Sequence, residues 1–209
     1  MITTFSADGK LTPDLLRPIL AEHNDEHWVQ PKLVYITNAT EIGTVYRKAE
    51  LQALREFCDA HNLWLYLDGA RLATGLMSDN SDLTIEDIAH LTDAFYIGGT
   101  KIGAMSAEAL VICHPALNSD FRFSLKQKGG LQAKGWLLGA QFAALFSDDL
   151  YFKLGKHLNE MASQLAAFFT EHGFDFLAPP ESNQVFVILP NDIAEKLTQQ
   201  FVFHRILLD

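Results

Sequence analysis

The chain has 209 residues, 48% of them hydrophobic, and its 16 basic against 26 acidic side chains give a formal net charge of −10. This length can bury the core of one large domain, or of one domain and a piece of another. Basic residues form no stripe that could follow phosphates, so we do not expect nucleic-acid binding. No apolar run approaches the roughly 18 to 20 residues of a membrane span, so we expect neither membrane insertion nor secretion.

Strand and helix patterns alternate in the first part of the chain. Thr12 followed by Pro13 predicts the start of a short helix. The β-rich run 33–37 precedes an amphipathic helix over 48–61. The nearly continuous apolar run 63–67 predicts a strand covered on both faces. Because a helix separates these two strands, we expect them to be parallel.

Two further strands complete the predicted sheet. Thr84, with Asp87 three residues later, predicts a capped helix that leads into a strand over 94–97. The run 109–113 is the last strand of this part. The loop before it is too short for a helical crossover, so we expect this strand to be antiparallel to its neighbour. The pattern predicts an α/β fold with a mixed sheet.

The remainder of the chain changes character. Two long helical patterns cover residues 131–146 and 150–172. Residues 174–176 and the alternating run 184–189 suggest strands of a second layer. We therefore place a domain boundary just before the first of these helices.

Polar signatures follow the ends of two neighbouring predicted strands, which is where open α/β sheets bind ligands. Lys101 is flanked by glycines, so a ligand can approach its amine closely, and partial desolvation would favour the neutral, nucleophilic form. Asp68, at the mouth of an apolar strand, fits a partner for a protonated pyridine nitrogen. Arg71 lies three residues on, and its guanidinium suits a substrate carboxylate. The three predict an amino-acid site.

These residues sit in motifs that resemble the threonine aldolases and related β-eliminating lyases, which depend on pyridoxal 5'-phosphate (PLP). The motifs are YLDGARL at 66–72 and FYIGGTK at 95–101, supported by DGKLT at 8–12, GTVY at 43–46 and SNQVF at 182–186. The resemblance extends from about residue 8 to about residue 200. It implies that Lys101 is the Schiff-base lysine, Asp68 the partner of the pyridinium nitrogen and Arg71 that of the substrate carboxylate. Thr100 is implied as a polar neighbour of the cofactor phosphate.

The resemblance also implies an architecture. It is the fold of PLP enzymes of fold type I, with residues 1–130 as part of the large domain and 131–209 as part of the small C-terminal domain. Family members are longer at both ends, and the phosphate-binding helix start, a ring-stacking residue and a second carboxylate-binding arginine have no counterpart here. Active sites completed between subunits imply a homodimer or homotetramer.

The implied activity is cleavage of a β-hydroxy-α-amino acid such as threonine into glycine and an aldehyde. Three alternatives stay open: a truncated, non-catalytic fragment, a PLP-dependent β-elimination lyase, and a transaminase. Glu41 is the residue that we would test as the base for the β-hydroxyl proton, although a loop glutamate is usually only solvated. Lys126, Lys128 and Lys134 could form an anion site or, as we favour, a solvated basic face.

The cysteines and histidines give no sign of a metal site. Cys58 and Cys113 resemble small buried hydrophobic residues and belong to no CxxC motif, so a reducing cytoplasm is the simple expectation. The histidines show no metal-binding spacing such as HExxH. We predict no metal.

Overall fold

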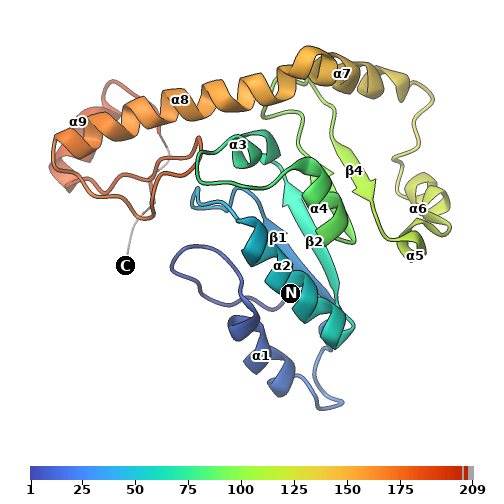
Figure 1. Cartoon of the computed structure of the whole chain (residues 1–209). Helices are drawn as coiled ribbons and strands as arrows, with labels where there is room; N and C mark the ends of the chain where they lie inside the picture. The colour runs from blue at the N-terminus through green and yellow to red at the C-terminus, as the bar shows by residue number, and fades with distance from the viewer. Residues whose placement is uncertain (204, 207–209) are drawn as a thin grey trace.

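A four-stranded mixed sheet forms the centre of the protein in a computed structural model that describes residues 1–203, 205 and 206 (Figure 1). The strands lie in the order β1-β2-β3-β4. The first three are parallel, and β4 is antiparallel to β3, as the sequence predicts. The strands are β1 (Leu33–Thr37), β2 (Trp64–Gly69), β3 (Ala94–Ile97) and β4 (Ala109–Ile112).

Helices connect the parallel strands and cover one face of the sheet (Figure 1). The predicted helix starts are confirmed: the Thr12 hydroxyl accepts a hydrogen bond from the amide of Leu15, and Thr84 and Asp87 cap each other reciprocally. The helices of this part are α1 (Pro13–Glu22), α2 (Lys48–His61), α3 (Leu72–Leu76) and α4 (Ile85–Leu91).

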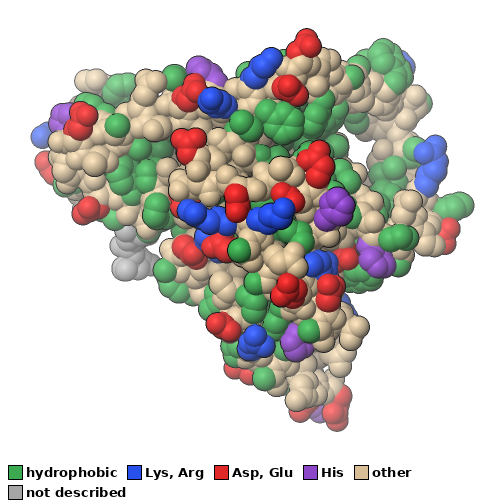
Figure 2. Space-filling model, viewed as in Figure 1, with side chains coloured by type: hydrophobic (Ala, Val, Ile, Leu, Met, Phe, Trp, Pro, Cys, Tyr) green, Lys and Arg blue, Asp and Glu red, His purple; other side chains and the backbone are tan. Residues whose placement is uncertain are grey.

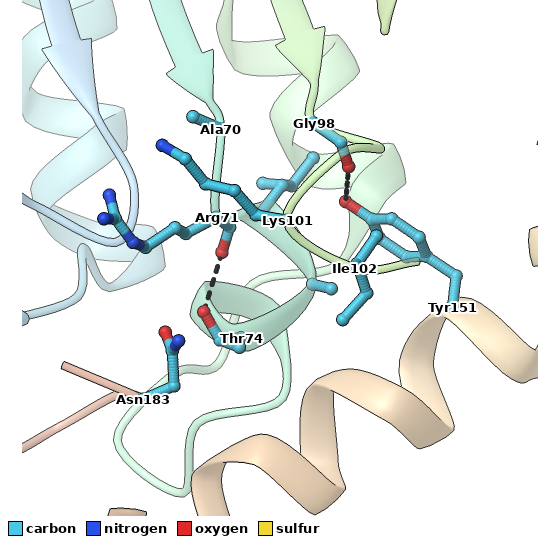
Figure 3. Close-up of a pocket in the computed structure, with 10 residues that line it drawn as sticks. Ala70, Arg71, Thr74, Gly98, Lys101, Ile102, Tyr151 and Asn183 are labelled. Atoms are coloured by element: carbon cyan, nitrogen blue, oxygen red, sulfur yellow. Dashed lines mark hydrogen bonds between the residues drawn. The ribbon is translucent and has the colours of Figure 1, made fainter. Parts of the chain in front are cut away.

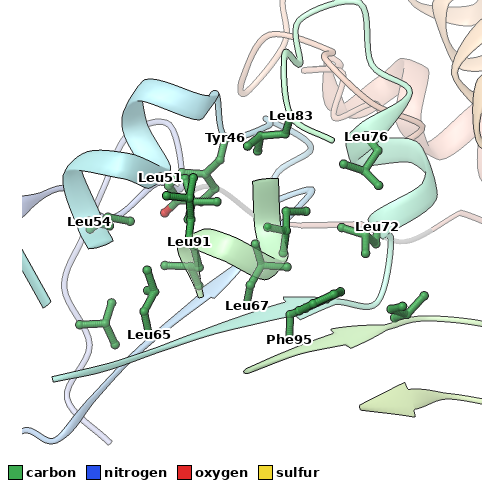
Figure 4. Close-up of a cluster of buried hydrophobic side chains, with 14 of the residues drawn as sticks. Tyr46, Leu51, Leu54, Leu65, Leu67, Leu72, Leu76, Leu83, Leu91 and Phe95 are labelled. Atoms are coloured by element: carbon green, nitrogen blue, oxygen red, sulfur yellow. The ribbon is translucent and has the colours of Figure 1, made fainter. Parts of the chain in front are cut away.

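The core lies between this sheet face and the helices (Figure 4). Alternate strand residues point into it, and Leu65 and Leu67 of β2 are fully buried. Cys58 of α2 is also fully buried, as expected, and desolvation raises the pKa of its thiol to about 11. Other core residues in Figure 4 are Leu51, Leu54, Leu72, Leu76, Leu91 and Phe95.

The opposite face of the sheet is open. Strand register pairs Tyr35 with Tyr66 and Asp68 with Tyr96, so these four side chains share this face. Tyr35 is 47% exposed, whereas the other three are half-buried. The prediction that the second strand is covered on both faces is therefore wrong. Its run reads as continuously apolar because large aromatic rings, which shield one another, occupy the open face.

The second half of the chain is mainly helical. The helix predicted from residue 131 begins at Trp136, whereas the predicted start at residue 150 is confirmed. The two predicted strands reduce to one antiparallel bridge between Phe176 and Val187, in a segment where prolines lack amide donors. These helices are α5 (Pro115–Asn118), α6 (Phe121–Gln127), α7 (Trp136–Phe146), the 3-10 turn η1 (Ser147–Asp149), α8 (Leu150–Glu171) and α9 (Asn191–Thr198).

The long helix α8 lies beside α3 (Figure 1). The division into units 1–130 and 131–209 stays a prediction. Among residues 1–203, 205 and 206, no helix is both long enough and apolar enough to cross a bilayer.

Candidate active site

Lys101 lies on a tight loop that follows β3. The loop starts with two buried glycines that have no room for a side chain. A Cβ atom at Gly98 would lie 2.4 Å from the carbonyl oxygen of Ala70, and one at Gly99 would lie 2.2 Å from that of Ala107. Gly98 therefore allows this loop to pack directly against the segment after β2, and Gly99 allows the start of the loop to pack against its end.

The far side of the loop is anchored by its own backbone and by one apolar side chain. The amides of Ile102 and Ala104 both donate to the carbonyl of Gly99, at 3.0 and 2.9 Å. Ile102 is buried, whereas the side chain of Lys101 is exposed. The loop thus presents the amine of Lys101 outward, and no hydrogen bond or ion pair holds this amine within the described part of the chain.

Asp68 is the penultimate residue of β2 and lies on the open face of the sheet. One carboxylate oxygen accepts the amide of Ala70 at 2.8 Å, and the other accepts the hydroxyl of Tyr35. The Tyr35 ring stacks on Tyr66 with centroids 5.5 Å apart. Desolvation, followed by the hydrogen bond to Asp68, raises the pKa of Tyr35, so its hydroxyl remains a donor at neutral pH.

Arg71 and Lys101 line the same pocket, together with residues of α3 and α8 (Figure 3). Figure 3 shows both side chains extending toward the same side of this pocket. Arg71 immediately precedes α3, and its carbonyl oxygen accepts the hydroxyl of Thr74 at 3.0 Å. An amine that can act as a nucleophile and a guanidinium that can bind a carboxylate are thus brought together.

A segment from the C-terminal half completes this pocket. Ser182 donates to the carbonyl of Gly43 at 2.8 Å, and the Val45 amide donates to Glu181 at 2.9 Å. These bonds bring Asn183 into the pocket lining. The Oδ1 atom of Asn183 is buried and has no hydrogen-bond partner among the residues that the structure describes.

Thr100 is not among the residues that line this pocket, and it is hydrogen-bonded to Glu108. Its amide and its hydroxyl both donate to the Glu108 carboxylate, which also accepts the amide of Gly99. Although desolvation acts in the opposite direction, these hydrogen bonds and one from Tyr96 hold the pKa of Glu108 below its ordinary value. Glu108 is therefore ionised at neutral pH.

The structure brings Lys101 and Arg71 into one pocket and places Asp68 beside it through Ala70. Sequence reasoning missed four polar residues around these: Tyr35, Glu108, Tyr151 and Asn183. Tyr35 carried a usable signal, because it lies two residues before the end of a strand that was predicted to be parallel to the strand of Asp68. Asn183 carried another, because it belongs to the motif at 182–186 that supports the family resemblance.

The chain is similar to known proteins along most of its length. Residues 2–192 match the family described as "Beta-eliminating lyase". The chain is 34% identical to the low specificity L-threonine aldolase of Pseudomonas aeruginosa over 190 residues, which cover 90% of this chain and 55% of the relative. A protein of the same name from another Pseudomonas strain is 33% identical over 94% of this chain and 57% of its own length.

A solved structure of Leishmania major threonine aldolase superposes with a TM-score of 0.95 at 48% identity, covering 98% of this chain and 60% of that one. The expected fold of PLP enzymes of fold type I is thus confirmed. The chain spans just over half the length of the curated relatives that it matches. Because the family match covers most of its residues, this chain belongs to the β-eliminating lyase family.

Proposed function

We propose that this chain provides the PLP-binding part of an aldehyde-lyase that cleaves a β-hydroxy-α-amino acid, such as threonine, into glycine and an aldehyde. One observation carries the proposal: Lys101 and Arg71 line one pocket beside Asp68, in a chain that superposes closely on a threonine aldolase. A PLP-dependent β-elimination lyase and a non-catalytic fragment are the alternatives that the experiment below separates.

The side chains present fit two ends of PLP. The Asp68 carboxylate already accepts a hydrogen bond from the Tyr35 hydroxyl on the open face of the sheet. It can equally accept a hydrogen bond from a protonated pyridine nitrogen. Lys101 offers an exposed amine on a loop with room for close approach. When bound, PLP supplies an electron sink for the bond broken at Cα. The role of Thr100 beside the cofactor phosphate stays a prediction. In this structure its hydroxyl donates a hydrogen bond to Glu108.

The chain's own groups would act on the substrate as follows. Arg71 binds the carboxylate of the amino acid with its planar guanidinium and so fixes the orientation of Cα. Lys101 would hold the cofactor through its amine. A base must remove the proton of the β-hydroxyl, and Glu41, which is exposed in the loop after β1, stays the candidate to test.

We also propose a small-molecule amino acid as the ligand, a homodimer or homotetramer as the assembly, and the cytoplasm as the location. The family membership supports these three proposals. The exposed lysines Lys126, Lys128 and Lys134 leave both earlier interpretations of that basic face open.

The decisive experiment is titration of the purified chain with PLP. We expect the absorption band of lysine-bound PLP in the wild type and in Lys156→Ala, which removes an exposed lysine of α8, but not in Lys101→Ala. Turnover is then compared for threonine, allo-threonine, serine and tyrosine. Glycine released from the first two indicates an aldolase, whereas elimination from the last two indicates the β-elimination alternative. A wild type without the band identifies a non-catalytic fragment.

A further inference from the structure

Glu108 closes the base of the loop that carries Lys101. The loop connects two antiparallel neighbours, and Ile97, the last residue of β3, pairs with Ala109, the first residue of β4. Glu108 therefore lies at one stem of the loop and Gly98 at the other. Its carboxylate reaches across this stem to the two residues that precede Lys101.

Three donors from the opposite stem converge on this one carboxylate. The amide of Gly99 donates to Oε2 at 2.6 Å, and the amide of Thr100 donates to Oε1 at 3.2 Å. The hydroxyl of Thr100 also donates to Oε1. Hydrogen bonds to an ionised acceptor are stronger than those between neutral groups, and three on one group fix its direction as well as its distance.

The turn hydrogen bonds from Ile102 and Ala104 to the Gly99 carbonyl close the loop around Thr100. Within the described residues, the side chain that bonds Thr100 itself is Glu108. Backbone packing fixes Gly98 and Gly99 at the start, and the buried Ile102 fixes the end. Thr100 lies between them and is exposed, so apolar packing cannot hold it in place. The backbone conformation of Thr100 sets the direction in which the side chain of the next residue, Lys101, extends.

We propose that Glu108 is a positioning residue, whose carboxylate holds Gly99 and Thr100 so that the amine of Lys101 faces the pocket shared with Arg71. The inference rests on the proposed role of Lys101. This role explains why a glutamate, Glu108, directly precedes the apolar strand β4.

Two variants and a control test the proposal. Glu108→Ala removes the acceptor of the three contacts with Gly99 and Thr100, and that of the hydrogen bond from Tyr96. Glu108→Gln keeps one acceptor oxygen and the shape of the side chain. Glu160→Ala removes an exposed glutamate of α8 that makes no hydrogen bond or ion pair within the described residues. Glu108→Gln remains informative if the alanine variant fails to fold.

The first measurement is amide hydrogen exchange, which requires no cofactor. In Glu108→Ala we expect exchange at Gly99 and Thr100 to accelerate by about tenfold or more, with a smaller increase in Glu108→Gln and none in Glu160→Ala. Amides of the core strand β2 should exchange as in the wild type. Unchanged exchange at Gly99 and Thr100 in Glu108→Ala and Glu108→Gln overturns the proposal.

The second measurement is the affinity for PLP, read from the absorption band that depends on Lys101. We expect about a tenfold loss in Glu108→Ala and partial recovery in Glu108→Gln. Faster exchange with unchanged affinity contradicts a positioning role toward Lys101. If the wild type shows no band, the proposed function of this chain fails, and the exchange result still decides whether Glu108 holds the loop.

Discussion

The sheet part, residues 33–113, and the helical part, residues 114–203, bury their apolar side chains to very different degrees. The inner face of the sheet is closed by leucines of near-zero exposure. In the helical part, by contrast, Trp136 is 68% exposed and Phe168 is 51% exposed. Figure 2 shows hydrophobic surface along the top of the molecule, where α7 and α8 lie. The sheet part therefore supplies most of the hydrophobic stabilisation.

A narrow stripe on α8 joins the two parts, in addition to the hydrogen bonds of Glu181 and Ser182 to the segment after β1. Tyr151 donates to the carbonyl of Gly98 at 3.2 Å, and Asn159 donates to that of Thr74 at 2.9 Å. Gly155 lies between these two positions on the same helix face. A Cβ atom there would lie 2.5 Å from the carbonyl oxygen of Ala73. Helix α8 is thus docked by hydrogen bonds and close backbone contact, at the edge of the pocket that holds Lys101.

The largest expected effect is in the sheet core. Leu67→Ala should lower the free energy of unfolding by about 2–5 kcal/mol, because the side chain is fully buried and its removal leaves a cavity. The matched change in the helical part, Leu165→Ala, removes a side chain that is 51% exposed and should cost less than about 1 kcal/mol. Urea denaturation of both variants measures the difference. Equal losses would remove the contrast between the two parts.

A glycine pair tests the junction, with an intermediate effect. Gly155→Ala forces the Cβ atom into the carbonyl of Ala73 and should destabilise the protein by about 1–3 kcal/mol. Gly139→Ala, in α7, meets nothing within 4 Å and should stabilise it by up to about 1 kcal/mol, since alanine is the better helix former. Thermal unfolding of the two variants should shift in opposite directions. A stabilising Gly155→Ala would show that α8 is not closely docked.

The smallest expected effect is a pH dependence of stability that arises from Glu108. Desolvation raises the pKa of Glu108, but hydrogen bonds from Thr100, Gly99 and Tyr96 outweigh it and hold this pKa below its ordinary value. The ionised carboxylate therefore stabilises the fold at any pH above the ordinary pKa of a glutamate. The contribution is lost as pH falls through the lowered pKa. At neutral pH the free energy of unfolding of the wild type should exceed that of Glu108→Gln by less than about 1 kcal/mol, because the carboxylate is partly solvated. Urea denaturation should show the two converging below about pH 4. A difference independent of pH would exclude the charge as its source.

The sequence predicted the sheet and the region of the candidate site because both depend on local signals. Alternation and apolar runs identified the strands, and helical spacing between them fixed which neighbours are parallel. Asp68, Arg71 and Lys101 could be grouped because each follows a strand end, and parallel strands bring such ends to one edge. The open face escaped prediction, since half-buried aromatic rings and buried leucines read alike as apolar residues.

The amino-acid sequence by itself determined the α/β class, the strand directions and the family resemblance, because these are set by periodicity and by short contiguous motifs. Only the tertiary structure decided which distant groups surround Lys101. Glu108 contacts its loop across a hairpin, Tyr151 reaches Gly98 from α8, and Asn183 arrives through hydrogen bonds to the segment after β1. Such contacts depend on how whole elements pack against one another, and no local pattern of residues records that packing.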